Sequence, residues 1–175
     1  MTQRTFRSNM SKDVAVHPRV GCGCFLLSPE HPGKALFGKR KGSHGAGRYA
    51  LPGGKLELDE LIEECVVREI KEEVNADITV EGVVQIGATN DRRMDGDINK
   101  HYVTIHCRAV LLPDSAPIEN LEPHKCEGWE WMSYEEIMAM YEQGVATGQH
   151  ALFEPTQHLI ERGLMDKAFW SHLFE

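Results

Sequence analysis

The chain has 175 residues, of which 41% are hydrophobic and 26% are charged, as in an ordinary soluble globular domain. Its 27 acidic and 19 basic residues give a formal net charge of −8, which argues against nucleic-acid binding, because that function needs a basic surface. The longest apolar run is far shorter than a membrane span. We therefore expect a cytoplasmic protein with no nucleic-acid or membrane partner. Its five cysteines are odd in number and lack a CxxC pair, which favours reduced or buried thiols over a disulfide framework.

Residues 1–18 are interpreted as an N-terminal tail and residues 19–175 as a single domain. Arg4, Arg7 and Lys12 give the tail a faint likeness to a mitochondrial transit segment, but it lacks an apolar face and contains Asp13. A loose tail is therefore favoured over a targeting segment.

The first two predicted strands are residues 19–28 and 35–40, joined by a turn cluster rich in Pro, Gly and Ser that predicts a hairpin. Residues 41–48 follow as a glycine-rich loop with several cations: Lys39, Arg40, Lys41 and Arg48. Two interpretations stay open for this loop, contact with phosphates or the nucleoside and a flexible hairpin end with solvated charges. The second is favoured for Lys39 and Lys41.

A helix is predicted from residue 61 to residue 74, which contain no Gly or Pro, with Asp59 as its N-cap. Apolar residues recur at every fourth position and define one buried stripe: Ile62, Val66, Ile70 and Val74. Asn75 is expected to end the helix, because Asn tolerates the left-handed conformation better than most residues.

Three carboxylates share one flank of that stripe: Glu69, Glu72 and Glu73. Crowded carboxylates repel one another unless a counter-charge is present, and Mg²⁺ binds one or two carboxylates together with waters and phosphate oxygens. The alternative is a solvated acidic face with ion pairs such as Glu64/Arg68 and Arg68/Glu72. The preceding Gly53-Gly54 pair favours the metal site, because glycines let the backbone approach a ligand closely.

Further strands are predicted at residues 78–88 and 101–112, with a polar loop at 90–99. The acidic residues of this loop lack EF-hand spacing, so a solvated loop is favoured over a Ca²⁺ site. His101 and His106 are interpreted as strand histidines with partners inside the fold, rather than as metal ligands.

Residues 126–132 alternate and predict a strand on which Trp129 and Trp131 share a face, with a core role favoured over base stacking. Glu127 is a candidate accessory carboxylate. A helix to about residue 143 should follow Ser133, with Glu136 completing a capping box. A second helix is predicted from about residue 150 to just before Gly163, and residues 165–174 as an amphipathic tail docked by two aromatic residues: Trp170 and Phe174.

The order Gly54, five residues, Glu60, seven residues, Arg68-Glu69-Ile70, one residue, Glu72-Glu73 resembles the signature of the Nudix (MutT-type) hydrolases. Two positions depart from it, Asn75 where the family has Gly and Ala76 where a bulkier apolar residue is usual. The flanking segments 38–43, 101–105 and 122–131 are similar to a cytosolic eukaryotic subgroup of nucleotide triphosphate diphosphatases, so the resemblance covers roughly residues 19–163.

The resemblance implies an α/β fold, a Nudix α/β/α sandwich with a mixed β-sheet. It implies Mg²⁺, or Mn²⁺ as a substitute, on Glu69, Glu72, Glu73 and the Gly53 carbonyl, and catalytic roles for these carboxylates and Arg68. Glu60 is expected to stabilise the loop. Substrate-binding residues by correspondence are Arg40, Leu51, Gly54 and Phe153. Glu154 replaces an aromatic residue of the close relatives.

The implied reaction is hydrolysis of a nucleoside triphosphate, including oxidised or modified purine nucleotides, to a monophosphate and pyrophosphate. A homodimer is implied by the same subgroup. Other substrates remain open, namely dihydroneopterin triphosphate, a dinucleotide polyphosphate or a nucleotide sugar. A non-catalytic nucleotide-binding module is the rival from another class, and the complete set of box carboxylates counts against it.

Overall fold

The computed structural model of this chain describes residues 17–42, 44–92, 94–97 and 99–175. The predicted N-terminal tail, apart from its last two residues, and the transit segment considered with it lie outside this part of the chain. The elements follow one another in the order β1 (Arg19–Leu27), β2 (Lys34–Arg40), β3 (Tyr49–Ala50), α1 (Ile62–Val74), η1 (Val80–Gly82), β4 (Val84–Asp91), η2 (Met94–Gly96), β5 (Tyr102–Val110), β6 (Cys126–Ser133), α2 (Tyr134–Thr147), α3 (Glu154–Glu161) and α4 (Lys167–His172).

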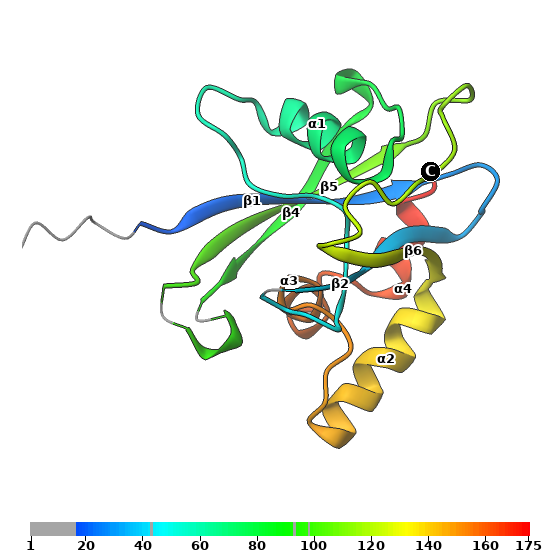
Figure 1. The fold of residues 1–175 in the computed structure, drawn as a ribbon. Helices are drawn as coiled ribbons and strands as arrows, with labels where there is room; N and C mark the ends of the chain where they lie inside the picture. Colours follow the sequence, from blue (N-terminus) through cyan, green and yellow to red (C-terminus); the bar gives the residue numbers. More distant parts are fainter. Residues whose placement is uncertain (1–16, 43, 93, 98) are drawn as a thin grey trace, which may run out of the picture.

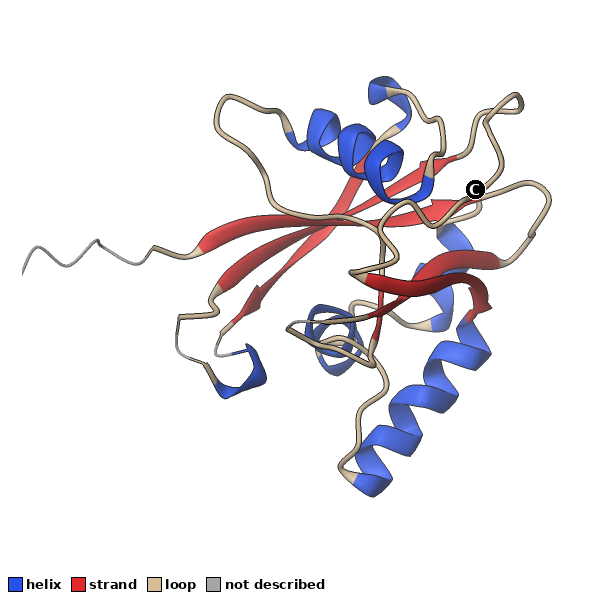
Figure 2. Cartoon of the chain, in the orientation of Figure 1, coloured by secondary structure: helices blue, strands red, loops and turns tan. Residues whose placement is uncertain are grey.

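Within the described residues, six strands form one mixed sheet in the order β3-β2-β1-β5-β4, with β6 pairing to β2 (Figure 1). β1 and β5 run parallel in continuous register from Arg19↔Tyr102 to Leu27↔Val110, and the other pairs are antiparallel. Helix α1 covers one face, while α3 and α4 lie on the other (Figure 2). The predicted α/β sandwich with a mixed sheet is confirmed.

Alternation along the central strand places side chains in two separate cores. Cys22, Cys24 and Leu26 of β1 pack on the α1 side, whereas Phe25 and Leu27 pack against the C-terminal helices. Successive strand residues point to opposite faces, so a strand covered on both sides must be apolar at nearly every position. This is why residues 19–28 read as one apolar run. All five cysteines are buried and free, as predicted.

The predicted hairpin between the first two strands forms only at its turn end, where Leu27 is in register with Ala35. The segment after β3 occupies the edge of β1 beyond that point. The Cys24 amide donates to the Pro52 carbonyl at 2.9 Å, and the Cys22 amide donates to the Gly54 carbonyl at 2.8 Å. β2 therefore separates from β1 and pairs with β3 and β6 instead.

Helix α1 starts later than predicted. Its N-cap is Leu61, whose amide donates to the Glu64 carboxylate at 2.9 Å, while Asp59 lies in the preceding turn with φ 65°. Asp59 is therefore not the cap, and Glu64 bonds to the helix start instead of pairing with Arg68. The end of the helix is as predicted, because Asn75 adopts the left-handed conformation with φ 59°.

Strand β4 lies later in the chain than predicted. Thr79 accepts a hydrogen bond from the Gly82 amide through its side chain, and the short helix η1 replaces the expected start of the strand. At the other end, β4 extends through Asn90 and Asp91, which pair with β5. The loop prediction was therefore wrong for these two residues, although Asn90 is exposed as expected and only Asp91 is fully buried.

The C-terminal third mostly follows the prediction. Ser133 caps α2 with Glu136 in a capping box, although the helix runs to Thr147. α3 starts at Glu154, four residues later than predicted, because Pro155 is accepted in the first turn of a helix but not inside one. Trp170 is buried and donates to the Gly33 carbonyl at 3.1 Å, which docks α4. Within the described residues, no helix has the length and apolar character needed to cross a membrane.

Candidate active site

Gly53 and Gly54, at the start of the Nudix-like signature, lie where there is no room for a side chain. A Cβ on Gly54 would stand 2.2 Å from Oε1 of Glu69, and a Cβ on Gly53 would stand 2.2 Å from the Cys22 carbonyl oxygen. Gly53 also has φ 143°, which L side chains rarely adopt. The missing side chains allow the loop to lie directly between β1 and the carboxylates of α1.

Arg68 organises the acidic face of α1. Its guanidinium donates to Glu60 through Nε at 2.7 Å and Nη2 at 3.0 Å, to Glu69 at 2.8 Å and to Glu72 at 3.4 Å. The Glu60 carboxylate also accepts from the Glu57 amide, and the Arg68 bonds hold the pKa of Glu60 down at about 2. The prediction that Glu60 stabilises the loop is confirmed by these contacts.

Glu69 and Glu73 occupy a different electrostatic environment. Burial raises the pKa of Glu69 even though Arg68 donates to it, and burial raises the pKa of Glu73 to about 8, helped by the charges of Glu69 and Glu122. Oε2 of Glu73 accepts a hydrogen bond from the Gly53 amide at 2.9 Å. The protein thus places two carboxylates in a poorly solvated position without enough positive charge to stabilise both anions.

In the described part of the chain, no three Asp, Glu, His or Cys side chains converge closely enough to hold a metal ion. Arg68 draws Glu69 and Glu72 toward itself, and the Gly53 amide draws Glu73. The donor set nevertheless fits a hard divalent cation, because it offers several carboxylate oxygens from one helix flank, while the single Arg68 charge is shared among Glu60, Glu69 and Glu72. Glu72 is the outermost of the three, with its side chain 58% exposed.

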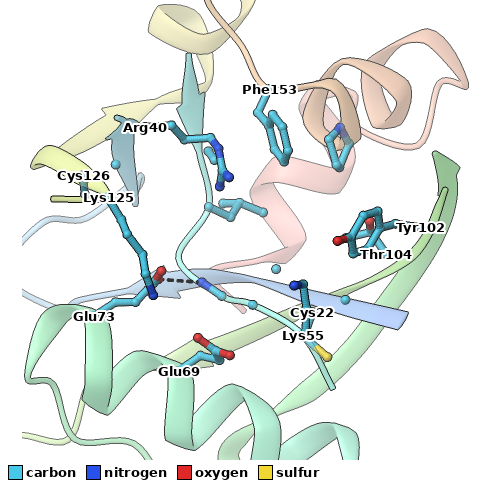
Figure 3. A pocket seen from close by; sticks show the side chains of 18 of the residues that line it. Cys22, Arg40, Lys55, Glu69, Glu73, Tyr102, Thr104, Lys125, Cys126 and Phe153 are labelled. Atoms are coloured by element: carbon cyan, nitrogen blue, oxygen red, sulfur yellow. Dashed lines mark hydrogen bonds between the residues drawn. The ribbon is translucent and has the colours of Figure 1, made fainter. Parts of the chain in front are cut away.

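These residues line one wall of a pocket of about 520 Å³. All predicted site residues line it: Arg40, Leu51, Gly53, Gly54, Arg68, Glu69, Glu72, Glu73 and Phe153. Figure 3 shows Glu69 and Glu73 on one side of the pocket and Phe153, Tyr102 and Thr104 across it, with Arg40 near Phe153. Residues from four distant parts of the sequence therefore meet around one cavity.

The far side of the pocket is built around Phe153. The Arg40 guanidinium carbon lies 4.3 Å from the centre of the Phe153 ring, and the Arg40 Nε donates to the His44 carbonyl at 2.9 Å. A Cβ on Gly45 would meet the same ring at 2.6 Å. The next residue, Glu154, forms an ion pair with Arg48 at 2.9 Å. Phe153 is therefore the aromatic surface that this segment presents to the pocket.

Glu127 does not join the carboxylates. It forms an ion pair with Lys39 at 2.9 Å, with both side chains well exposed, so the suggestion that it is an accessory carboxylate was wrong. Trp129 and Trp131 pack against the core on the α1 side, as predicted, and Trp129 also lines the pocket. Trp131 stacks on His31 with ring centres 4.6 Å apart.

Several residues that line the pocket were not assigned a site role from the sequence, among them Lys125, Thr104 and His106. Lys125 pairs with Glu122 at 2.7 Å and its charge acts on Glu69 and Glu73. Its place within the 122–131 segment was the signal that could have drawn attention to it. Thr104 and His106 are two residues apart on β5 and share one face of the strand. Nothing in the strand pattern distinguished these two side chains from ordinary core residues.

A glycine loop set against a carboxylate-bearing helix, on a mixed sheet with helices on both faces, defines a class of α/β domains. Comparison with known proteins identifies the family within that class to which the chain belongs. The family model for the NUDIX domain matches residues 17–153, so the chain belongs to the Nudix family.

Two relatives found by sequence and one solved structure illustrate the relationship. An ADP-ribose pyrophosphatase of Methanocaldococcus jannaschii is 37% identical over 83 residues, which cover 47% of each chain. A CTP pyrophosphohydrolase of Escherichia coli is 34% identical over 110 residues, 62% of this chain and 73% of that protein. A MutT NUDIX hydrolase from Burkholderia pseudomallei superimposes with a TM-score of 0.59 at 28% identity, over 69% of this chain and 86% of its own. The match thus spans less than half the length of the archaeal relative.

Proposed function

We propose that the protein is a Mg²⁺-dependent pyrophosphohydrolase that cleaves nucleoside triphosphates, including oxidised or modified purine nucleotides, to a monophosphate and pyrophosphate. The observation that carries the proposal is the position of Glu69 and Glu73, which lie partly buried beside the Gly53-Gly54 backbone on the wall of a nucleotide-sized pocket. Their raised pKa values mark a place that requires added positive charge.

In this proposal, Glu69, Glu72, Glu73 and the Gly53 carbonyl hold Mg²⁺ or Mn²⁺. Such a metal, when bound, neutralises phosphate oxygens and lowers the pKa of the attacking water. Arg68 keeps Glu69 in place by a charge-assisted hydrogen bond, and it is itself fixed by Glu60. Glu72, the most exposed of the three carboxylates, is a further ligand or the proton acceptor.

The remaining polar groups of the pocket suit an anionic substrate in an acidic protein. Arg40, Lys55 and Lys125 contribute cations around the cavity, and Phe153 offers a flat apolar surface on the far side. A phosphate chain would lie along the carboxylate wall with its metal, and the nucleoside would lie near Phe153. Little covalent chemistry is asked of the protein, so positioning and charge stabilisation provide the rate enhancement.

A second substrate class is favoured by the relatives themselves. One is named an ADP-ribose pyrophosphatase and another a CTP pyrophosphohydrolase. The two names share a diphosphate attached to a nucleoside, and they differ in what lies beyond it. Nucleoside diphosphate derivatives are therefore the alternative substrates, together with dihydroneopterin triphosphate and dinucleotide polyphosphates.

The test is a substrate panel with product identification by mass. Purified protein is incubated with GTP, ATP, CTP, 8-oxoguanosine triphosphate, ADP-ribose and dihydroneopterin triphosphate, with Mg²⁺ present or chelated. Release of a monophosphate with pyrophosphate from a triphosphate, dependent on the metal, supports the proposal. Preferred cleavage of ADP-ribose supports the second class, and no cleavage of any compound by folded protein rejects both and leaves the binding module.

The subgroup resemblance also suggests a cytoplasmic homodimer. Light scattering of the purified protein across a concentration series tests the dimer, because a monomeric mass at every concentration would contradict it. Fractionation of cells that produce the full chain tests the location.

A further inference from the structure

A buried hydrogen-bond network lies behind the far wall of the pocket, centred on Asp91 at the end of β4. The Asp91 carboxylate is fully buried. Its Oδ2 accepts from the hydroxyl of Thr89 at 2.9 Å and from the hydroxyl of Thr104 at 2.5 Å, and its Oδ1 contacts Nδ1 of His158 at 2.7 Å.

The network holds Asp91 in its ionised form. Burial alone would raise the pKa of Asp91, but the hydrogen bonds from His158, Thr104 and Thr89 outweigh burial and lower it. The bond to Asp91 correspondingly raises the pKa of His158. An ionised carboxylate has no proton to donate, so both threonine hydroxyls must act as hydrogen-bond donors to Asp91.

Counting protons then fixes what each side chain offers to a ligand. The Thr89 hydroxyl uses its hydrogen in the bond to Asp91, so its oxygen can only accept from Nε2 of His106, which lies 3.0 Å away. His106 therefore carries its proton on Nε2, and burial lowers its pKa to about 4, so the ring is neutral. Its Nδ1 is left as a lone-pair acceptor, and this buried atom has no hydrogen-bond partner among the described residues.

Thr104 is fixed in the same way. Its proton points to Asp91, so the rest of the hydroxyl oxygen presents lone pairs. Thr104 and His106 are two residues apart on β5, share a face of the strand and both line the pocket. Thr104 lies across the pocket from Glu69 and Glu73 (Figure 3). The side of the cavity that faces away from the carboxylates thus carries two hydrogen-bond acceptors, Thr104 and His106. Asp91 fixes both of them as acceptors.

We propose that Asp91 fixes the nucleoside end of the pocket as an acceptor-only edge, formed by the Thr104 hydroxyl oxygen and Nδ1 of His106, which selects substrates whose base carries an exocyclic amino group. This inference rests on the proposed function, because it assigns the base-recognition end of the same site. An amino group carries two hydrogens for two acceptors, whereas a carbonyl oxygen in the same position would face lone pairs and leave all of them unpaired. Asp91 is a positioning residue, since it acts through Thr104 and His106.

The first arm of the test compares nucleotides that differ only in that group. The pairs are ATP with purine riboside triphosphate, GTP with inosine triphosphate, and CTP with 2-pyrimidinone riboside triphosphate, in which hydrogen replaces the 4-amino group, all assayed for pyrophosphate release with Mg²⁺. We expect the amino-bearing member of at least one pair to have a kcat/KM about tenfold to a hundredfold higher. Ratios within about twofold in all three pairs overturn the inference, even though turnover would still support the proposed function.

The second arm uses matched substitutions. Thr104→Val keeps the shape and removes the acceptor, while Thr104→Ser keeps the hydroxyl and its bond to Asp91. We expect the preference for the amino-bearing nucleotide to fall toward one in Thr104→Val and to persist in Thr104→Ser. An unchanged preference in a folded Thr104→Val protein rejects the role of Thr104.

His106 provides an independent pair of variants, because the amide of Asn occupies roughly the place of Nδ1 and the amide of Gln the place of Nε2. His106→Gln should keep the contact with Thr89 and lose the preference, whereas His106→Asn should retain more of it. The opposite order contradicts the assignment of Nδ1. If no compound in the panel is hydrolysed by the wild-type protein, the proposed function fails first. Binding of the same pairs, measured as shifts in melting temperature, then decides the base preference alone.

Discussion

The carboxylate of Glu73 accepts a hydrogen bond from the backbone amide of Gly53 at 2.9 Å, across a sequence separation of 20 residues. This contact joins the glycine loop to the helix that bears the other acidic residues. It also shows why Gly53 and Glu73 act together, since the loop supplies backbone groups and the helix supplies charge.

Replacing Glu73 by Gln should abolish most metal-dependent turnover while the fold is retained. The amide oxygen can still accept from Gly53, but the negative charge needed by a divalent cation is lost, so we expect kcat to fall by roughly 10²–10⁴. Rates at saturating nucleotide and a thermal melt of each protein measure this. Glu81→Gln, an exposed carboxylate on η1, is the control, and a near-normal rate for folded Glu73→Gln would refute the assignment.

Replacing Gly54 by Ala tests whether space beside Glu69 is required. The added methyl would stand 2.2 Å from the Glu69 carboxylate, so this side chain must move away from the pocket wall. We expect activity to drop by at least tenfold with a smaller change in melting temperature, because a misplaced catalytic group costs more than a local shift in packing. Gly128→Ala is the matched control, since a Cβ there meets nothing within 4 Å. Equal activities of the two variants would contradict the prediction.

Arg68→Lys should destabilise the protein even though the charge is kept. Lysine cannot reproduce the two bonds to Glu60 together with the bond to Glu69, so we expect a loss of about 1–3 kcal/mol in the free energy of unfolding. Urea denaturation measures it. A double-mutant cycle with Glu60→Gln should show that the two changes are not additive, whereas simple additivity would mean that the pair is not coupled.

Two histidines should act in opposite directions on the pH dependence of stability. His106 has a folded-state pKa of about 4, below its unfolded value of 6.5. Unfolded chains therefore bind a proton that folded chains do not, and the contribution of His106 to the free energy of unfolding should fall by about 3 kcal/mol as the pH drops from 6.5 to 4. His158 acts in the opposite direction, because its folded pKa is raised. Its contribution is present below pH 6.5 and is lost as the pH rises through the folded pKa.

Urea denaturation of wild-type, His106→Asn and His158→Gln proteins at several pH values separates these effects. The His106 variant should lose part of the acid-side slope between pH 6.5 and 4. The His158 variant should lose part of the decline above pH 6.5. Identical profiles for all three proteins would show that neither residue titrates as described.

Much of the acidic face could be predicted because it is local. The spacing of Ile62, Val66, Ile70 and Val74 reflects helical periodicity, and the carboxylate flank follows from the same geometry. The left-handed end at Asn75 and the capping box of Ser133 are also local, and both formed as expected. The start of α1 was missed because the bond from the Leu61 amide to Glu64 competed with the expected Asp59 cap.

The amino-acid sequence by itself determined the helix, the glycine loop, the apolar strands and the family, since each depends on residues within about 25 positions of one another. The tertiary structure alone decided which distant groups share the pocket. Strand pairing brought Asp91 to Thr104, and α3 brought His158 to Asp91 and Phe153 to Arg40. The sequence pattern of a strand reports burial but not the identity of the partner across the sheet. The protonation order of this network became visible only once those partners were in contact.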